Sequence, residues 1–107
     1  MSVRAISWAY GQNLGSASQK AVLLHLAYLA REEDNCARPH VTRIQAETEL
    51  SERTVHKALK ALQDKRLIAL GDQNLAAVHG NGDIVPANRR PKVWILRLDH
   101  SGKADRS

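Results

Sequence analysis

Apolar residues recur at helical spacing near the middle of the chain, at positions i, i+4 and i+7: Val55, Leu59 and Leu62. Ser51 precedes this apolar stripe. It is a favourable N-cap, because its hydroxyl can accept a hydrogen bond from the free backbone N–H groups of the first turn. The pattern therefore predicts a helix over residues 52–65, preceded by a tight turn and a shorter helix over residues 41–49.

A further helix is predicted from residue 17 to about residue 31, after a segment with the S-x-x-Q form of a capping box, Ser16-Ala17-Ser18-Gln19. This helix is apolar on almost all of its faces, which is more than one core-facing stripe requires. The stripe expected to face the core consists of Val22, Leu26 and Leu29. Two interpretations remain open for the second apolar face. Either Ile6 and Trp8 of the preceding segment cover it, or it forms a dimer interface that uses Trp8, Leu24 and Tyr28.

The segments that flank these helices are less regular. In residues 1–13 the apolar Ile6, Trp8 and Tyr10 alternate with smaller residues, so this lead-in is expected to be an extended arm, with a single helical turn as the alternative. Residues 32–38 form a polar connection that can finish as a minimal strand.

The C-terminal part predicts a β-hairpin. Residues 67–70 and residues 92–98 are each rich in strand-forming apolar residues, and they are expected to pair antiparallel. The connection over residues 71–91 is longer than the ~12–15 residues usual for unstructured loops in compact domains. Residues 99–107 are expected to form a flexible tail, which leaves residues 1–98 as a single domain.

Charge is distributed unevenly along the chain. The sequence has 16 Lys and Arg against 11 Asp and Glu, giving a net charge of +5 and a pI near 9.8. Residues 50–70 carry five basic and two acidic side chains, whereas residues 31–49 carry three basic and five acidic ones. The positive charge is thus concentrated on the predicted 52–65 helix and the C-terminal strand, an arrangement that favours a polyanionic partner.

Other classes of function find little support in the sequence. It contains no G-x-x-x-x-G-K-[ST], H-E-x-x-H or G-x-S-x-G motif, so an enzyme is not expected. Cys36 and His40 lack a second pair of zinc ligands, so no metal site is predicted and Cys36 is interpreted as a small buried hydrophobe. No cofactor or small-molecule ligand is evident. A single cysteine, no apolar run near the ~20 residues of a membrane span and no signal peptide predict a cytoplasmic, nucleoid-associated protein.

Residues 39–68 resemble the winged helix-turn-helix domains of bacterial and phage regulators and of phage or plasmid replication proteins. The usual pattern is a Pro, an Ile or Leu, then S-x-x-T-V and a long amphipathic helix ending near L-I. The matching positions here are Pro39, Ile44, Ser51, Thr54, Val55, Leu59, Leu62, Leu67 and Ile68. Residues 6–9 and 20–24 are also similar to the N-termini of phage replisome-organiser proteins, so the resemblance covers roughly two thirds of the chain.

This resemblance implies a mainly α fold, with about three helices and a small two- or three-stranded antiparallel sheet whose hairpin is called the wing. Two positions depart from the family's pattern. Glu49 and Arg66 stand where such turns usually have Gly. Either both residues adopt left-handed conformations, or both turns are built differently.

The resemblance also implies a double-stranded DNA partner, with the recognition helix over residues 52–65 in the major groove. The expected base contacts are Glu52, Arg53, His56 and Lys57. Arg43, Ser51, Thr54 and Lys60 are expected to contact phosphates, and the wing is expected to contribute Arg89, Arg90 and Lys92. Solvated side chains remain the alternative for the charged groups, and Glu52 can instead stabilise the helix dipole.

The function predicted is a sequence-specific DNA-binding protein, a transcriptional regulator of a phage, plasmid or other mobile element. Replication proteins of this kind normally continue into a partner-binding region, and little follows Leu98, which favours the regulator. Two alternatives stay open. One is the origin-binding domain of a replication initiator, and the other is a winged-helix module that binds protein.

Overall fold

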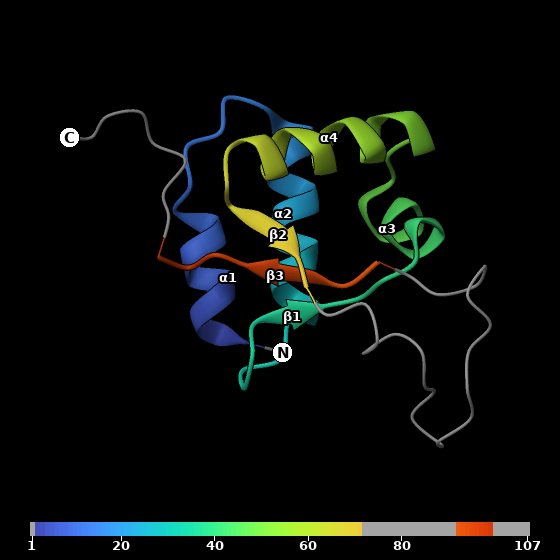
Figure 1. Ribbon diagram of the computed structural model, residues 1–107. Coiled ribbons are helices and arrows are strands. Elements are labelled where there is room, and N and C mark those ends of the chain that lie inside the picture. Colours follow the sequence, from blue (N-terminus) through green and yellow to red (C-terminus); the bar gives the residue numbers. More distant parts are fainter. Residues whose placement is uncertain (1, 72–91, 100–107) are drawn as a thin grey trace, which may run out of the picture.

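The winged helix-turn-helix fold is present in the computed structural model, which describes residues 2–71 and 92–99. The elements are, in chain order, α1 (Val3–Tyr10), α2 (Ala17–Leu29), β1 (Cys36–Ala37), α3 (Val41–Thr48), α4 (Glu52–Asp64), β2 (Ile68–Leu70) and β3 (Trp94–Leu96). The predicted fold class is confirmed. The expected helices appear within one or two residues of their predicted ends (Figure 1).

The N-terminal segment differs from the extended arm expected for it, because α1 is a helix of eight residues. The side chain of Ser2 accepts a hydrogen bond from the Ala5 N–H at 3.1 Å and so caps the first turn. Ala5 and Ala9, four residues apart, are both fully buried. The expectation was wrong because it followed the large residues Ile6, Trp8 and Tyr10. The inward face is instead made of alanines, whose small side chains leave room for a neighbouring helix to lie close.

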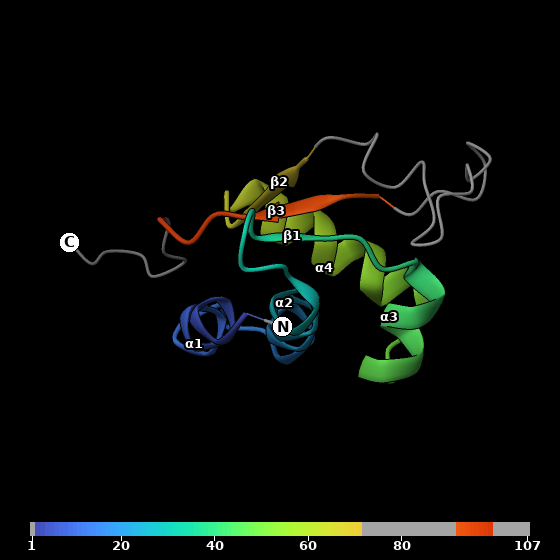
Figure 2. The same ribbon diagram turned by 90° about the horizontal axis from the view of Figure 1, so that it is seen from below.

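That neighbouring helix is α2, which lies beside α1 beneath the sheet and α4 (Figures 1 and 2). Its N-cap is the predicted one, since the Ser16 hydroxyl accepts from the Gln19 N–H at 3.3 Å. Its buried residues lie on several faces: Val22, Leu23, His25, Leu26 and Ala27. Contacts with α1, α3, α4 and the sheet explain why almost the whole circumference of α2 is apolar.

The sheet has three antiparallel strands in the order β1-β3-β2. The predicted hairpin is confirmed, with Ile68 opposite Leu96 and Leu70 opposite Trp94. The minimal strand expected after the polar connection is β1, which pairs through Cys36 with Ile95. Cys36 is buried with a free thiol, as predicted. Burial raises the pKa of this thiol above its ordinary value.

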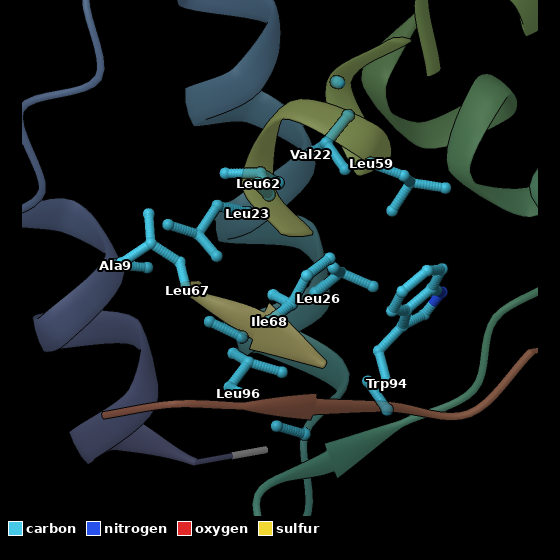
Figure 3. Close-up of a cluster of buried hydrophobic side chains, with 14 of the residues drawn as sticks. Ala9, Val22, Leu23, Leu26, Leu59, Leu62, Leu67, Ile68, Trp94 and Leu96 are labelled. Carbon is cyan, nitrogen blue, oxygen red and sulfur yellow. The ribbon is translucent and has the colours of Figure 1, made fainter. Parts of the chain in front are cut away.

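The hydrophobic core lies where α2, α4 and the sheet meet (Figure 3). Leu26 of α2 points toward Ile68 of β2 and Leu96 of β3, and all three are at most 2 % exposed. The inward stripe of α4 is the predicted one, since Val55, Leu59 and Leu62 are at most 5 % exposed. Burial of this stripe fixes which side of α4 faces away from the domain.

Candidate functional site

The turn between α3 and α4 sets the angle between the two helices. Glu49 ends α3 in the left-handed conformation, with φ 62° and ψ 29°. Its N–H donates to the Gln45 carbonyl at 2.8 Å. Leu50 follows and packs partly buried against the core. Of the two alternatives for this turn, the left-handed one is confirmed, although a non-glycine residue pays a conformational cost there.

The C-terminus of α4 is closed by a Schellman motif. The Arg66 N–H donates to the Gln63 carbonyl at 2.9 Å, and the Leu67 N–H donates to the Leu62 carbonyl at 3.0 Å. Arg66 occupies the left-handed position with φ 62°, so the left-handed alternative holds here too. The Lys65 side chain extends toward the start of α2, where its Nζ donates to the Leu14 carbonyl at 3.0 Å and to Gln19 Oε1 at 2.6 Å. The position of α4 is therefore fixed at both ends.

Three exposed cationic side chains line the face of α4 that is turned away from its buried stripe: Arg53, Lys57 and Lys60. They stand at i, i+4 and i+7, which places them on one face of the helix. None of them forms an ion pair with a residue in the described part of the chain. Their charges therefore remain available to a partner. This cationic face of α4 is the strongest candidate for a functional surface.

Glu52 and His56, also predicted to face the partner, lie one turn apart on α4 and are both exposed. His56 Nε2 lies 3.6 Å from Glu52 Oε2, so the two side chains interact when the histidine is protonated. Glu52 occupies the first turn, where a carboxylate also stabilises the helix dipole. The structure brings the two predicted residues together and leaves Glu52 with both of its expected roles.

Ser51 and Thr54 form the N-cap of α4. The Ser51 hydroxyl accepts from the Thr54 N–H at 3.2 Å and donates to Thr54 Oγ1 at 2.9 Å. The cap is as predicted. Because the hydroxyl hydrogen of Ser51 is already used, Thr54 is the better donor of the two for an external oxygen.

Arg43, a predicted phosphate contact, lies exposed on α3 and is paired along its own helix. Its Nε is 3.5 Å from Glu47 Oε2, while Glu47 Oε1 is 3.3 Å from Nδ1 of His25 on α2. His25 is only 8 % exposed, and burial lowers its pKa below the ordinary value while Glu47 opposes that shift. Glu47 was not among the predicted site residues, although its i, i+4 spacing from Arg43 indicates such a pair.

One backbone hydrogen bond joins the two ends of the long connection between β2 and β3. The Gly71 N–H donates to the Val93 carbonyl at 2.9 Å. A Cβ at position 71 would lie 2.9 Å from Cγ1 of Ile95, so a glycine is required for this close approach. Lys92 precedes Val93 and is exposed. Arg89 and Arg90, the other predicted wing contacts, lie outside the described residues, as does most of the long connection.

The three residues predicted for a dimer interface are not equivalent. Trp8 and Leu24 are partly buried and pack against the core of their own chain. Tyr28 is 52 % exposed. The interpretation in which the N-terminal segment covers the second face of α2 therefore accounts for Leu24, but leaves Tyr28 uncovered.

Comparison with known proteins gives one match. Residues 16–68 match the model of a family described as a helix-turn-helix domain. This range runs from the N-cap of α2 into β2, so it contains α3, the turn and the cationic face of α4. No curated protein and no solved structure matches the chain. Among the helices of residues 2–71 and 92–99, none is long and apolar enough to cross a membrane.

Proposed function

We propose that the chain binds double-stranded DNA with α4 in the major groove, because residues 16–68 match a family of helix-turn-helix domains. The cationic face of α4 is the observation that carries this proposal. Arg53, Lys57 and Lys60 project from a helix whose opposite side is fixed in the core. A rigid helix with long donors on its free side is suited to reach base edges and phosphates.

The first turn of α4 is the part proposed to read sequence. Base contacts concentrate near the N-terminus of a recognition helix, and Arg53 can pair bidentately with guanine. Glu52, His56 and Lys57 are proposed to contact neighbouring bases. Glu52 can accept a hydrogen bond from a cytosine amino group once its interaction with His56 is exchanged for one with DNA.

The surrounding groups are proposed to hold the backbone of the duplex. These phosphate contacts are Arg43, Ser51, Thr54 and Lys60, with Lys92, Arg89 and Arg90 contributed by the wing. Arg43 must release Glu47 to reach a phosphate, an exchange of one weak surface ion pair for a charge-assisted hydrogen bond. Such contacts position the protein but carry no sequence information.

The salt dependence of affinity tests the assignment of this surface. Five cations are proposed to contact phosphates, namely Arg43, Lys60, Arg89, Arg90 and Lys92. If about five phosphates are neutralised, log affinity should fall with log salt concentration at a slope of about −4.5 per bound chain. Fluorescence anisotropy with a labelled random duplex measures this slope. A slope shallower than about −2 would rule out the proposed surface.

Transcriptional regulation of a phage, plasmid or other mobile element is the process that we propose for this binding. The resemblance of residues 39–68 to such regulators supports it, while the resemblance of the N-terminal part to replisome organisers supports origin binding as the alternative. Mapping of bound sites across the host genome and its mobile elements distinguishes the two. Sites that overlap promoters support regulation, whereas a cluster of repeats within one replication origin supports the alternative.

We propose that the chain forms a two-fold dimer on palindromic sites. Tyr28 would be the exposed contact of the dimer interface, and the partly buried Trp8 and Leu24 would complete it. Doubling the number of recognition helices would increase the affinity obtained from one short helix. Sedimentation at tens of micromolar tests the state of the free protein. A monomer with unchanged sedimentation in Tyr28→Glu would reject the dimer and leave the DNA proposal intact.

A further inference from the structure

A cavity of about 580 Å³ lies between the start of α3, the middle of α4 and the beginning of β3. Its apolar lining includes Ile44, Leu59 and Trp94. These three residues also belong to the core and are at most 5 % exposed, so the floor of the cavity is held by the packing of the domain. Ligand sites of small molecules are typically clefts of about 300–1,000 Å³ with a mainly apolar lining, and this cavity fits that range.

The polar side chains around the cavity are mostly donors. They come from three separate parts of the chain: His40 and Thr42 from the start of α3, His56, Lys60 and Gln63 from α4, and Lys92 from the entry to β3. No Asp or Glu occurs among the described residues that line it. Lys60 and Lys92 supply two positive charges without an acidic lining residue to neutralise them. The electrostatic field in the cavity therefore favours an anion.

We propose that this cavity binds a small amphipathic anion, namely an aromatic or branched aliphatic molecule that carries one carboxylate. The apolar part would lie on Trp94, Ile44 and Leu59, and the carboxylate would face Lys60 and Lys92. An inorganic anion or a DNA phosphate uses only the cationic rim and leaves the apolar floor without a partner. A neutral hydrocarbon contacts only the apolar floor. Only a molecule with both an apolar part and a carboxylate contacts the floor and the cationic rim together, so the cavity selects an amphipathic anion.

Occupation of the cavity also has a consequence for DNA, and this step rests on the proposed function. His56, Lys60 and Lys92 both line the cavity and belong to the proposed DNA-binding surface. A bound carboxylate neutralises cations that would otherwise meet phosphates, and its atoms lie beside the outward face of α4. The ligand and the duplex therefore compete, and the small anion acts as a release signal.

Direct titration of the full chain with 2-naphthoate, without DNA, tests the cavity. This probe has about 13 non-hydrogen atoms, and for a ligand of this size a dissociation constant of about 1 mM or tighter is expected. The indole N–H signal of Trp94 in a ¹H–¹⁵N NMR spectrum should shift and saturate, with Trp8 as the internal reference. The neutral 2-naphthamide should bind about two- to fivefold more weakly, as expected for loss of an exposed charge interaction.

Two lysines on α4 provide a matched pair of variants. Lys60 lines the cavity, whereas Lys57, three residues earlier and also exposed, does not. Lys60→Ala should weaken 2-naphthoate binding about two- to fivefold, and Lys57→Ala should leave it unchanged. The absence of a saturable shift of Trp94 would overturn the proposal. Equal effects of the two variants, or equal binding of 2-naphthamide, would also overturn it.

The competition is tested with a labelled duplex. 2-Naphthoate should displace DNA from the wild-type chain, and inorganic phosphate at the same ionic strength should not. If phosphate produces the same displacement and the same shift of Trp94, the site holds a simple anion and the proposal fails. Saturable naphthoate binding by a chain that binds no duplex would support the cavity and reject the proposed function. A chain that binds the duplex but not 2-naphthoate would reject the cavity as a ligand site and support the proposed function.

Discussion

The helices α2 and α4 are equal in length and begin in the same way, yet they have different surroundings. Both have 13 residues, and each begins at a serine whose hydroxyl accepts from the backbone N–H three residues later. Helix α2 is contacted by α1, α3, α4 and the sheet, and its buried residues lie on several faces. Helix α4 buries one stripe and leaves its cationic face uncovered.

Under the proposed function, this difference divides structural and binding roles between two similar elements. A helix with neighbours on most sides contributes apolar area and determines stability. A helix with one free side keeps its position through the buried stripe, and the free side can change without loss of the fold. Substitutions on α2 should therefore act on the free energy of unfolding, and substitutions on the outward face of α4 should act on binding.

The largest expected effect is that of Leu26→Ala on α2. Leu26 is fully buried among α2, β2 and β3, so the substitution removes apolar contacts and leaves a cavity. A loss of about 2–5 kcal/mol in the free energy of unfolding is expected, measured by urea denaturation followed by circular dichroism. Lys57→Ala on α4 is the control and should change this free energy by less than about 0.5 kcal/mol. Similar losses in both variants would contradict the division of roles.

Arg53→Ala on α4 should show the opposite pattern. It should cost about 1–3 kcal/mol of binding free energy on a duplex that carries a mapped binding site and much less on random DNA. The free energy of unfolding should stay within about 0.5 kcal/mol of the wild type, because the side chain is exposed and has no partner among the described residues. Equal losses on the two duplexes would assign Arg53 to a phosphate contact.

The two serine caps allow the most direct comparison of the helices. Ser16→Ala and Ser51→Ala each remove the acceptor of one first-turn hydrogen bond and should each cost about 1 kcal/mol of stability. Only Ser51→Ala should also weaken DNA binding, since it frays the end of the proposed recognition helix. Comparable binding losses in both variants, at a temperature where both are folded, would show that the affinity depends only on global stability.

Arg66→Gly should stabilise the domain by about 0.5–1 kcal/mol. At φ 62° the left-handed conformation of Arg66 is unfavourable, and glycine removes that cost while losing some conformational entropy on folding. The melting temperature measures the change. Asp64→Gly, at an exposed helical position in the last turn of α4, is the matched control and should destabilise the end of α4. A destabilised Arg66→Gly would mean that the Arg66 side chain contributes contacts that outweigh the backbone strain.

The smallest expected effect is a pH dependence that originates on α2. Burial holds the pKa of His25 below its ordinary value of 6.5, so the unfolded chain binds a proton more readily than the folded one. Stability should be complete above about pH 6.5 and should fall as the pH decreases toward the folded pKa. Glu47→Gln should enlarge this loss, because Glu47 raises the pKa. An unchanged acid dependence in His25→Leu would assign the titration to other groups.

The sequence was sufficient to predict α2 and α4, because their patterns are set locally. The strands β2 and β3 could be predicted from their apolar runs, and their antiparallel pairing agrees with the wing that the resemblance implies. Ser16 and Ser51 mark the beginnings of two helices, and the i, i+4, i+7 stripe marks the buried side of α4. The resemblance drew attention to Glu49 and Arg66 as positions that usually hold Gly, but it left two alternatives for each turn, and only the structure shows that both residues are left-handed.

Features that depend on two segments coming together could not be predicted in the same way. The helical state of α1 depends on Ala5 and Ala9 meeting α2, and alanine alone gives no sign of which face is buried. The pairing of His25 with Glu47 requires knowledge of the packing of α2 against α3. The cavity is bounded by residues as far apart as Ile44 and Trp94, so it exists only in the folded chain.

The hydrogen bond between Gly71 and Val93 has a consequence for how this domain can diversify. The two ends of the intervening segment are held together by the sheet itself, so the core does not depend on the length of chain that joins them. Each doubling of such a connection costs only about 0.6 kcal/mol in closure entropy. Insertions and deletions there are therefore nearly neutral for folding. Selection can lengthen, shorten or recharge this segment while the helices of the described residues remain the same, and under the proposed function such changes would alter which DNA is bound.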